Sequence, residues 1–156
     1  MTRHNPQRES FLERAKKFDT IDVVSNKFLN VAFDFQFFDK TQVAGQDFSD
    51  WSPDQILKLI DKIKGYCKET IAYWNKMPVG QGRNHVMEIY GTFPARSEFT
   101  PPLHVPIDVK WARFRLEGDM RLIGFVVPNE KCEEHKIPKN IFYVVFLDAY
   151  HKFFKK

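Results

Sequence analysis

The chain has 156 residues, 43% of them hydrophobic, and a net charge of +4; these values fit one folded domain, argue against wholesale disorder, and permit an anionic partner without requiring one. Its two cysteines are too few and too far apart for a disulfide framework, and its five histidines show no metal-ligand spacing. Because no apolar run reaches the roughly 18 residues of a membrane span, and the first residues are too polar for a signal peptide, we expect a cytoplasmic protein without metal, cofactor or membrane contact.

The N-terminal part predicts a helix followed by a strand. Residues 10–18 carry apolar side chains at helical spacing, namely Phe11, Leu12, Ala15 and Phe18. Residues 31–38 alternate in polarity, so Phe33, Phe35 and Phe37 are expected on one face of a strand. We expect a single domain over residues 1–156, in which residues 1–30 are a helical extension of a core that covers residues 31–156.

The helix that begins after Trp51 has the clearest local signal. Ser52 is a good N-cap, Pro53 suits the first helical position, and Gln55 completes a capping box. An apolar face follows and is expected to pack on the sheet; it consists of Ile56, Ile60, Ile63, Cys67, Ile71 and Trp74. Gly65 is expected to kink or split this helix.

The middle of the chain predicts one strand and one long irregular segment. Residues 85–90 are the expected strand. Residues 93–106 contain four prolines, which stiffen the chain and suit a surface insertion packed over the fold.

The final third predicts three strands, over residues 109–117, 121–127 and 141–147, with a polar loop at residues 128–140. The last strand is apolar at every position, which indicates an interior strand covered on both faces. The expected fold is therefore α+β, a largely antiparallel four- or five-stranded sheet with helices packed on one side.

The segment from Lys110 to Arg121 is the candidate functional surface. Arg113 and Arg115 also lie in it, interleaved with aromatic residues that include Trp111. Guanidinium groups match phosphate geometry, and aromatic faces can stack on unpaired bases. The segment therefore predicts a surface for single-stranded RNA. Alternating arginines are equally typical of an ordinary solvent-facing sheet, in which they pair with nearby carboxylates such as Glu117 and Asp119.

The turn between the two strands decides which face Arg121 occupies. A two-residue turn would pair Glu117 with Met120 and place Arg121 on the face opposite Arg115. A three-residue turn over residues 118–120 would place Arg121 on the same face as Arg113 and Arg115.

His151 follows the last strand and is the candidate proton-transfer group. An imidazole titrates near pH 6.5 and can donate or accept a proton. Nearby arginines are expected to lower its pKa, because they disfavour the charged form. Taken alone, the residue also fits an ordinary surface histidine at a strand end.

Residues 111–125 resemble the central hairpin of RelE/ParE-type toxins, in which an arginine-bearing strand leads through a Gly-Asp-like turn into a second arginine and an apolar run. A last apolar strand that ends at Tyr150 and His151 fits the same pattern. The resemblance covers roughly residues 30–156, with the motif detail in residues 109–154. It implies a RelE-like core with a proline-rich insertion at residues 93–106.

The resemblance also implies an activity and a set of site residues. It implies a toxin that cleaves mRNA on the ribosome without a metal, uses the RNA 2′-hydroxyl as nucleophile, and is held by an acidic antitoxin protein. By position, Arg121 and Arg115 would stabilise phosphate charge, and His151 would lie near the acid–base site. The remaining predicted RNA contacts are Lys110, Trp111, Arg113, Tyr150 and Lys152.

The chain departs from the family pattern in its N-terminal extension and its proline-rich insertion, and the glutamate that some members use has no counterpart. The ParE branch keeps the fold without ribonuclease chemistry and targets DNA gyrase. The alternative function is therefore a non-catalytic ParE-like or other protein-binding module of a toxin–antitoxin or phage-defence system. The third reading is an ordinary domain whose basic sheet is plain surface.

Overall fold

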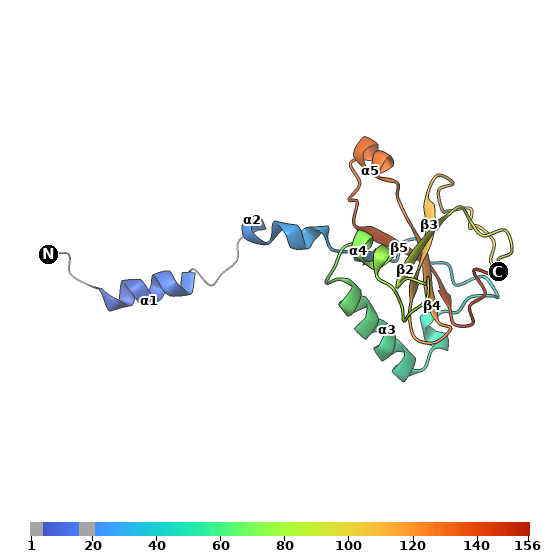
Figure 1. Cartoon of the computed structure of the whole chain (residues 1–156), viewed down its shortest axis with the longest axis horizontal. Helices are drawn as coiled ribbons and strands as arrows, with labels where there is room; N and C mark the ends of the chain where they lie inside the picture. The colour runs from blue at the N-terminus through green and yellow to red at the C-terminus, as the bar shows by residue number, and fades with distance from the viewer. Residues whose placement is uncertain (1–4, 16–20) are drawn as a thin grey trace.

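The computed structural model describes residues 5–15 and 21–156. It shows an α+β fold built on a five-stranded sheet in the order β1-β5-β4-β3-β2 (Figure 1). The strands are β1 (Ala32–Asp34), β2 (Met87–Gly91), β3 (Lys110–Arg115), β4 (Arg121–Val126) and β5 (Ile141–Asp148). Neighbours are antiparallel except for β1, which pairs with β5 in parallel. The predicted α+β class is confirmed, and this one parallel pair makes the sheet mixed.

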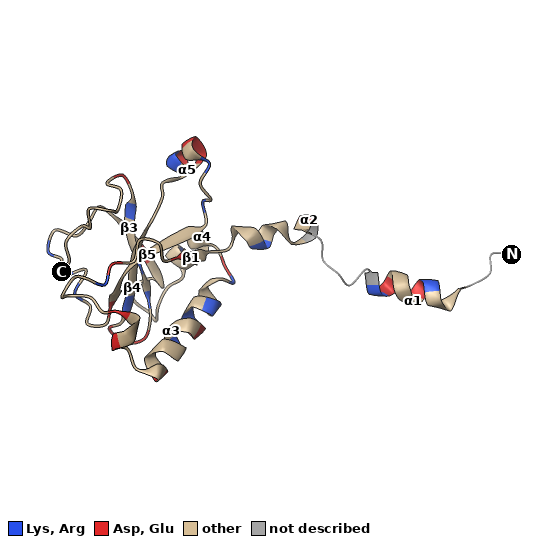
Figure 2. Ribbon diagram, turned by 180° about the vertical axis from the view of Figure 1, so that it is seen from behind, with Lys and Arg blue, Asp and Glu red and all other residues tan. Residues whose placement is uncertain are grey.

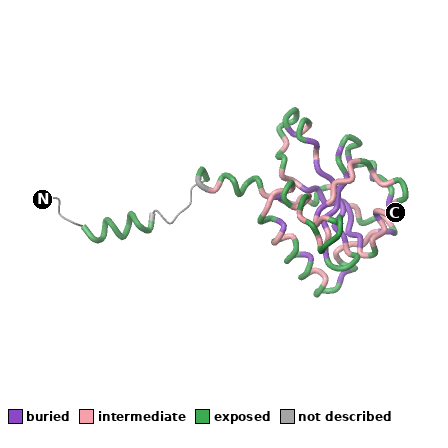
Figure 3. Tube along the Cα trace, viewed as in Figure 1, coloured by how far each residue is buried: buried purple, intermediate pink, exposed green. Residues whose placement is uncertain are grey.

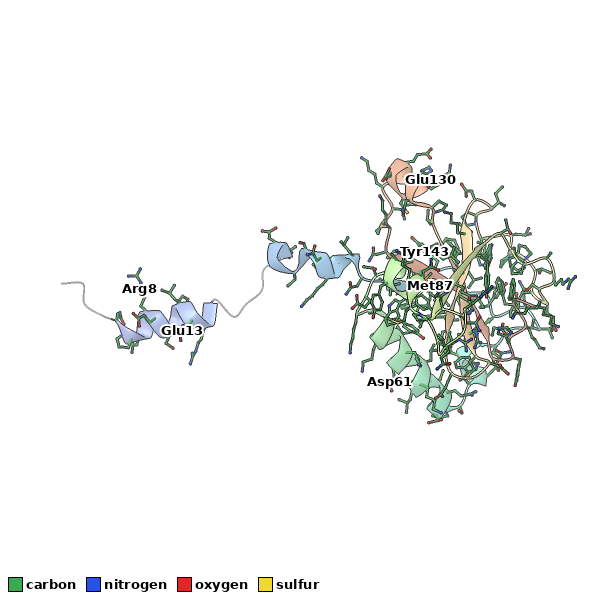
Figure 4. The ribbon with its side chains drawn as sticks, viewed as in Figure 1. Arg8, Glu13, Asp61, Met87, Glu130 and Tyr143 are labelled. Atoms are coloured by element: carbon green, nitrogen blue, oxygen red, sulfur yellow. The ribbon has the colours of Figure 1, made fainter. Side chains whose placement is uncertain are left out.

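The helices before the sheet are α1 (Pro6–Ala15), α2 (Ile21–Val24) and the 3₁₀ helix η1 (Ser25–Leu29). Helix α1 lies away from the sheet, and its described side chains are exposed (Figure 3). Arg8 and Glu13 mark it in Figure 4, whereas Met87 and Tyr143 lie within the body of the fold. The predicted N-terminal helix thus starts earlier than expected, and Phe18 lies outside the described residues.

Helix α3 (Pro53–Tyr66) begins as its sequence predicts. The Ser52 hydroxyl accepts a hydrogen bond from the Gln55 backbone N–H, and the Gln55 side chain accepts one from the Ser52 N–H. The helix continues past Gly65 and ends at Tyr66; α4 (Ile71–Lys76) then starts at its own N-cap, Thr70.

The buried face of α3 agrees only in part with the predicted one, since Cys67 is exposed as well as Ile60. Leu59 and Tyr66 are buried against the sheet with Ile56 and Ile63 packed beside them, whereas Ile60 is 47% exposed. The prediction for Ile60 is wrong because the helix turns Leu59, and not Ile60, toward the sheet. Trp74 of α4 packs on the same cluster, as predicted.

The β5 strand is interior, as its apolar sequence predicts, because β1 and β4 flank it and both of its faces are covered. On one face, α3 and α4 close a cluster that includes Phe114, Leu122 and Leu147. On the other face, a second cluster joins strand residues to Phe99 and Val105 of the proline-rich segment. That segment therefore packs over the fold rather than standing free of it.

Two other predictions about this part of the chain are wrong. The first strand is short, and the chain turns after Asp34, so Phe33 packs on the helix side of the sheet and Phe37 on the opposite side. The polar segment after β4 contains a helix, α5 (Asn129–His135), which carries acidic and basic residues together (Figure 2). Its Cys132 is buried, which anchors one side of this otherwise charged helix.

Among the described residues, none of the helices combines the length and the apolar character that crossing a bilayer requires.

Candidate functional site

The turn between β3 and β4 places Arg121 directly opposite Arg115. The Leu116 N–H donates to the Met120 carbonyl at 3.0 Å, and the Met120 N–H donates to the Glu117 carbonyl at 3.0 Å. The loop therefore consists of the three residues 117–119. The longer of the two predicted turns also had three residues but covered residues 118–120. Gly118 adopts φ 56°, a left-handed conformation that glycine accepts readily. Of the two arrangements that the sequence left open, the structure has the one in which Arg121 shares a face with Arg115.

Arg115, Arg121 and Asp148 form a row across three adjacent strands, because Arg121 is also the register partner of Asp148 on β5. Directly opposed residues share one face of a sheet. A pocket of about 200 Å³ lies on this face and is lined by Arg113, Arg115, Arg121 and His151. The structure therefore brings together all three predicted catalytic residues.

Arg113 is buried and its charge is compensated within the protein. Its Nη2 lies 3.1 Å from Oε2 of Glu88, its Nε donates to the Tyr90 hydroxyl at 3.1 Å, and its Nη1 donates to the His85 carbonyl at 3.2 Å. With every nitrogen of the guanidinium group bonded, Arg113 serves as a fixed wall of the pocket rather than a free phosphate donor.

Arg115 and Arg121 differ from Arg113 in having no carboxylate partner among residues 5–15 and 21–156. Arg121 is only 4% exposed and is held by its Nη1, which donates to the carbonyls of Gly118 and Met120. The Nε atoms of Arg115 and Arg121 are buried without a hydrogen-bond partner in the described structure. Such groups cost free energy when they are left unpaired. Two guanidinium groups without a carboxylate partner on one face also repel each other, and an anion between them would relieve that repulsion.

Burial, followed by the charges of Arg115 and Arg113, lowers the pKa of Arg121 to about 10. This value is still well above neutral pH, so the side chain keeps its charge there. The backbone of Arg115 is held in place as well: its N–H donates to the Val86 carbonyl at 2.8 Å, and its carbonyl accepts a hydrogen bond from the Tyr66 hydroxyl.

His151 reaches the pocket because Asp148 shapes the chain after β5. The buried Asp148 carboxylate accepts hydrogen bonds from the backbone N–H groups of Tyr150, Lys152 and Phe153, at 2.9 to 3.3 Å. This turn holds His151 at φ 55°, a left-handed conformation that is costly for most residues other than glycine and asparagine. Asp148 is thus the residue that positions His151.

The pKa of His151 lies below its ordinary value, chiefly because the ring is partly buried, and next because of the charge of Arg121. The direction agrees with the expectation from the sequence, although burial outweighs the arginines as the cause. Asp148 and Asp119 act in the opposite direction. His151 is therefore mainly neutral at pH 7, which is the form that can accept a proton.

We expect Asp148→Ala to lower the free energy of unfolding by about 3 kcal/mol or more, because three backbone N–H groups around a buried carboxylate lose their acceptor. Urea denaturation measures the effect. Asp108→Ala is the matched control, since Asp108 is exposed and pairs with Lys131 only at the surface, and its loss should change stability by less than about 1 kcal/mol. Equal stability of the two variants would show that the turn does not depend on Asp148.

An aromatic pair forms a further wall of the pocket. The rings of Tyr90 and Phe154 lie parallel, with centroids 4.8 Å apart and an interplanar angle of 1°. Both residues line the pocket together with the arginines, and Phe154 is only partly buried.

Several residues predicted to contact RNA lie outside this pocket. Trp111 is 5% exposed and packs against Phe125 and Phe146, so it has no free face for a base, and its prediction as a stacking surface is wrong. Lys110 is exposed at the opposite end of β3, five residues from Arg115, which is roughly 17 Å along a strand.

Tyr150 and Lys152 lie next to His151 in the chain without lining the pocket. Tyr150 is 70% exposed, and its ring is 5.8 Å from the Lys152 ammonium group. The Lys152 Nζ lies 3.5 Å from Oε2 of Glu98, a residue of the proline-rich segment. Lys155 forms an ion pair with the same carboxylate. These cations fasten the C-terminal segment to the proline-rich segment.

The sequence did not indicate Glu88, Tyr90 or Phe154 as site residues. Glu88 and Tyr90 alternate with Met87 and Ile89, but only the register of β2 against β3 shows that they face Arg113. Phe154 had no signal beyond its place in a basic C-terminal segment.

The arrangement does not match an ordinary solvent-facing row of ion pairs. Glu117, one of the expected partners of the arginines, instead binds Lys58 of α3 at 3.1 Å, and Arg113 and Arg121 are buried. In the part of the chain that the structure describes, no three His, Cys, Asp or Glu side chains gather as they would around a metal ion.

Comparison of the chain with protein-family models, with curated proteins and with solved structures gives no match.

Proposed function

We propose that this protein is a RelE-like toxin that cleaves RNA by attack of the ribose 2′-hydroxyl, with no metal in the reaction. One observation supports this proposal above the others. Arg115 and Arg121, two cations without a carboxylate partner among the described residues, line one pocket together with His151, which is mainly neutral at pH 7.

The chemistry assigns a role to each of these groups. Attack by the 2′-hydroxyl requires a base to take its proton, and the leaving 5′-oxygen requires a proton in return. His151 takes the proton of the 2′-hydroxyl, and a solvent water molecule supplies the proton that the leaving 5′-oxygen requires. The bond from phosphorus to the leaving oxygen breaks as the 2′-oxygen bonds to phosphorus, which produces a 2′,3′-cyclic phosphate and a 5′-hydroxyl end.

The charge of the pocket favours the transition state over the substrate. A phosphodiester carries one negative charge, and a second develops on the non-bridging oxygens as the 2′-oxygen attacks. Arg115 and Arg121 supply two positive charges, and because Arg121 is buried, water screens its charge less and the charge stabilises the transition state more effectively.

The resemblance of residues 111–125 to the central hairpin of RelE/ParE-type toxins supports the same proposal. The proposed substrate is mRNA, with the ribosome as the proposed setting and an acidic antitoxin as the proposed partner. An acidic segment of such a partner would compete with RNA for the two arginines.

The test is cleavage of a single-stranded RNA by the purified full chain, with and without EDTA. We expect cleavage that EDTA leaves unchanged, with products that end in a cyclic phosphate. A matched strand with one 2′-deoxynucleotide at the preferred cleavage site is expected to stay intact there, because it lacks the nucleophile.

Three results would contradict the proposal: no cleavage of free or ribosome-bound RNA, cleavage of the deoxy-substituted position, or loss of the reaction in EDTA. Arrest of cell growth by the chain with all RNA left intact would instead support the alternative, a non-catalytic ParE-like module that binds a protein.

A further inference from the structure

We infer that the same pocket binds the dianion of a phosphate monoester, carried by a nucleotide whose base lies against Phe154, and that such nucleotides inhibit the protein. This inference deepens the proposed function and rests on the pocket assigned to it. It concerns a ligand that stays bound rather than one that reacts.

The pocket has an excess of positive charge that favours a multiply charged anion. The Arg113 charge is balanced by Glu88 at 3.1 Å. At the rim, the exposed side chains of Asp119 and Lys156 carry opposite charges. With His151 mainly neutral, Arg115 and Arg121 form no ion pair with any described carboxylate; Asp119 acts on Arg121 from the rim, and Asp148, its register partner, directs its oxygens to three backbone N–H groups.

A monoester dianion meets this requirement, whereas a diester carries one charge fewer. Geometry adds a reason, since guanidinium groups bind phosphate oxygens through paired N–H donors and a monoester has three terminal oxygens to accept them. The monoester also reproduces the charge of the cleavage transition state, which is why it should bind more tightly than an intact diester.

The aromatic wall indicates a nucleotide rather than free phosphate as the source of the dianion. Phe154 rests on Tyr90, whose hydroxyl is held by Arg113 Nε at 3.1 Å, so the stack has a fixed position beside the arginines. A base that stacks on an aromatic side chain gains affinity without sequence preference.

Isothermal titration calorimetry of the full chain tests the inference with probes that have no bond to cleave: adenosine 3′-monophosphate, adenosine 5′-monophosphate, inorganic phosphate, dimethyl phosphate and adenosine. At pH 7.5 we expect either nucleotide to bind more tightly than inorganic phosphate, and inorganic phosphate to bind at least about tenfold more tightly than dimethyl phosphate, which has a single charge. The nucleotide that binds more tightly indicates whether the natural ligand carries its phosphate at the 3′ or at the 5′ position.

Three matched comparisons separate the parts of the inference. Arg115→Ala should abolish binding of every phosphate probe, whereas Lys110→Ala, on the same strand and outside the pocket, should leave it unchanged. Phe154→Ala should reduce nucleotide affinity to that of inorganic phosphate without altering the latter. Nucleotide affinity should fall as the pH drops through about 6, where the monoester dianion takes up a proton, while sulfate, a dianion throughout, should bind no more weakly.

The inference is overturned if dimethyl phosphate binds as tightly as inorganic phosphate, or if the nucleotides bind equally well to Arg115→Ala. It is also overturned if the nucleotides fail to slow RNA cleavage in a chain that cleaves. Tight binding of the dianions by a chain that never cleaves RNA would remove the proposed function and leave the phosphate-monoester site standing.

Discussion

His151→Asn is expected to lower the rate of RNA cleavage by about 10²–10⁴-fold, the usual cost of removing a proton-transfer group. Asparagine is the informative replacement because, unlike most residues, it tolerates the left-handed backbone that the turn imposes at this position. The turn built by Asp148 should therefore persist, and the variant should lose only its acid–base group. Single-turnover cleavage of a short RNA measures the effect.

The pH profile distinguishes proton transfer from a structural role. Because the pKa of His151 is lowered from its ordinary 6.5, the neutral base form dominates at pH 7, and the rate should fall only as the pH drops through a value below 6.5. This acid limb should be absent from the residual activity of His151→Asn. His135→Asn is the control, since His135 is exposed on α5, outside the pocket, and its loss should change neither rate nor profile. An unchanged acid limb in His151→Asn would reject the assignment.

Arg121→Ala is expected to lower kcat by about 10²–10³-fold, as removal of a donor that stabilises transition-state charge commonly does. Arg121 is buried, and its Nη1 bonds to two carbonyls of the turn, so the loss of kcat must be measured alongside the melting temperature. Arg121→Lys keeps the charge but loses the planar fork, and we expect it to recover only part of the rate.

Arg115→Ala provides the second test of the same charge. Arg115 is only partly buried, and its guanidinium bonds to no other described residue, so its removal should reduce cleavage with little loss of stability. Lys110→Ala again serves as the control for a change in net charge alone. If both arginine variants cleave at the wild-type rate, the pocket does not hold the reacting phosphate.

The sequence was most informative where a local pattern determines the structure. The capping box at Ser52, the interior strand at the end of the chain, and the two arginines that flank one turn are all readable from neighbouring residues. His151 could be placed near the arginines because a strand that pairs with β4 must carry its C-terminal end back toward the hairpin turn.

The sequence could not predict which side chains are buried by segments that lie far away along the chain. Trp111 shares a strand face with Arg113 and Arg115 and so looks like a surface aromatic, but the proline-rich segment and the C-terminal segment cover it with Phe93 and Phe153. The same long-range packing decides that Leu59 rather than Ile60 is buried, and that Glu88, far away in the sequence, neutralises Arg113.

The parallel pairing of β1 with β5 has a consequence for the order in which the molecule folds. The β3–β4 hairpin closes a short loop and can form early, whereas β1 must wait for the last strand of the chain, and such distant pairings form slowly because closing a long loop costs entropy. Arg115 and Arg121 belong to the fast, local step. His151 arrives with β5, in the same late step that completes the sheet. During folding, we therefore expect the two arginines to come together before His151 joins them.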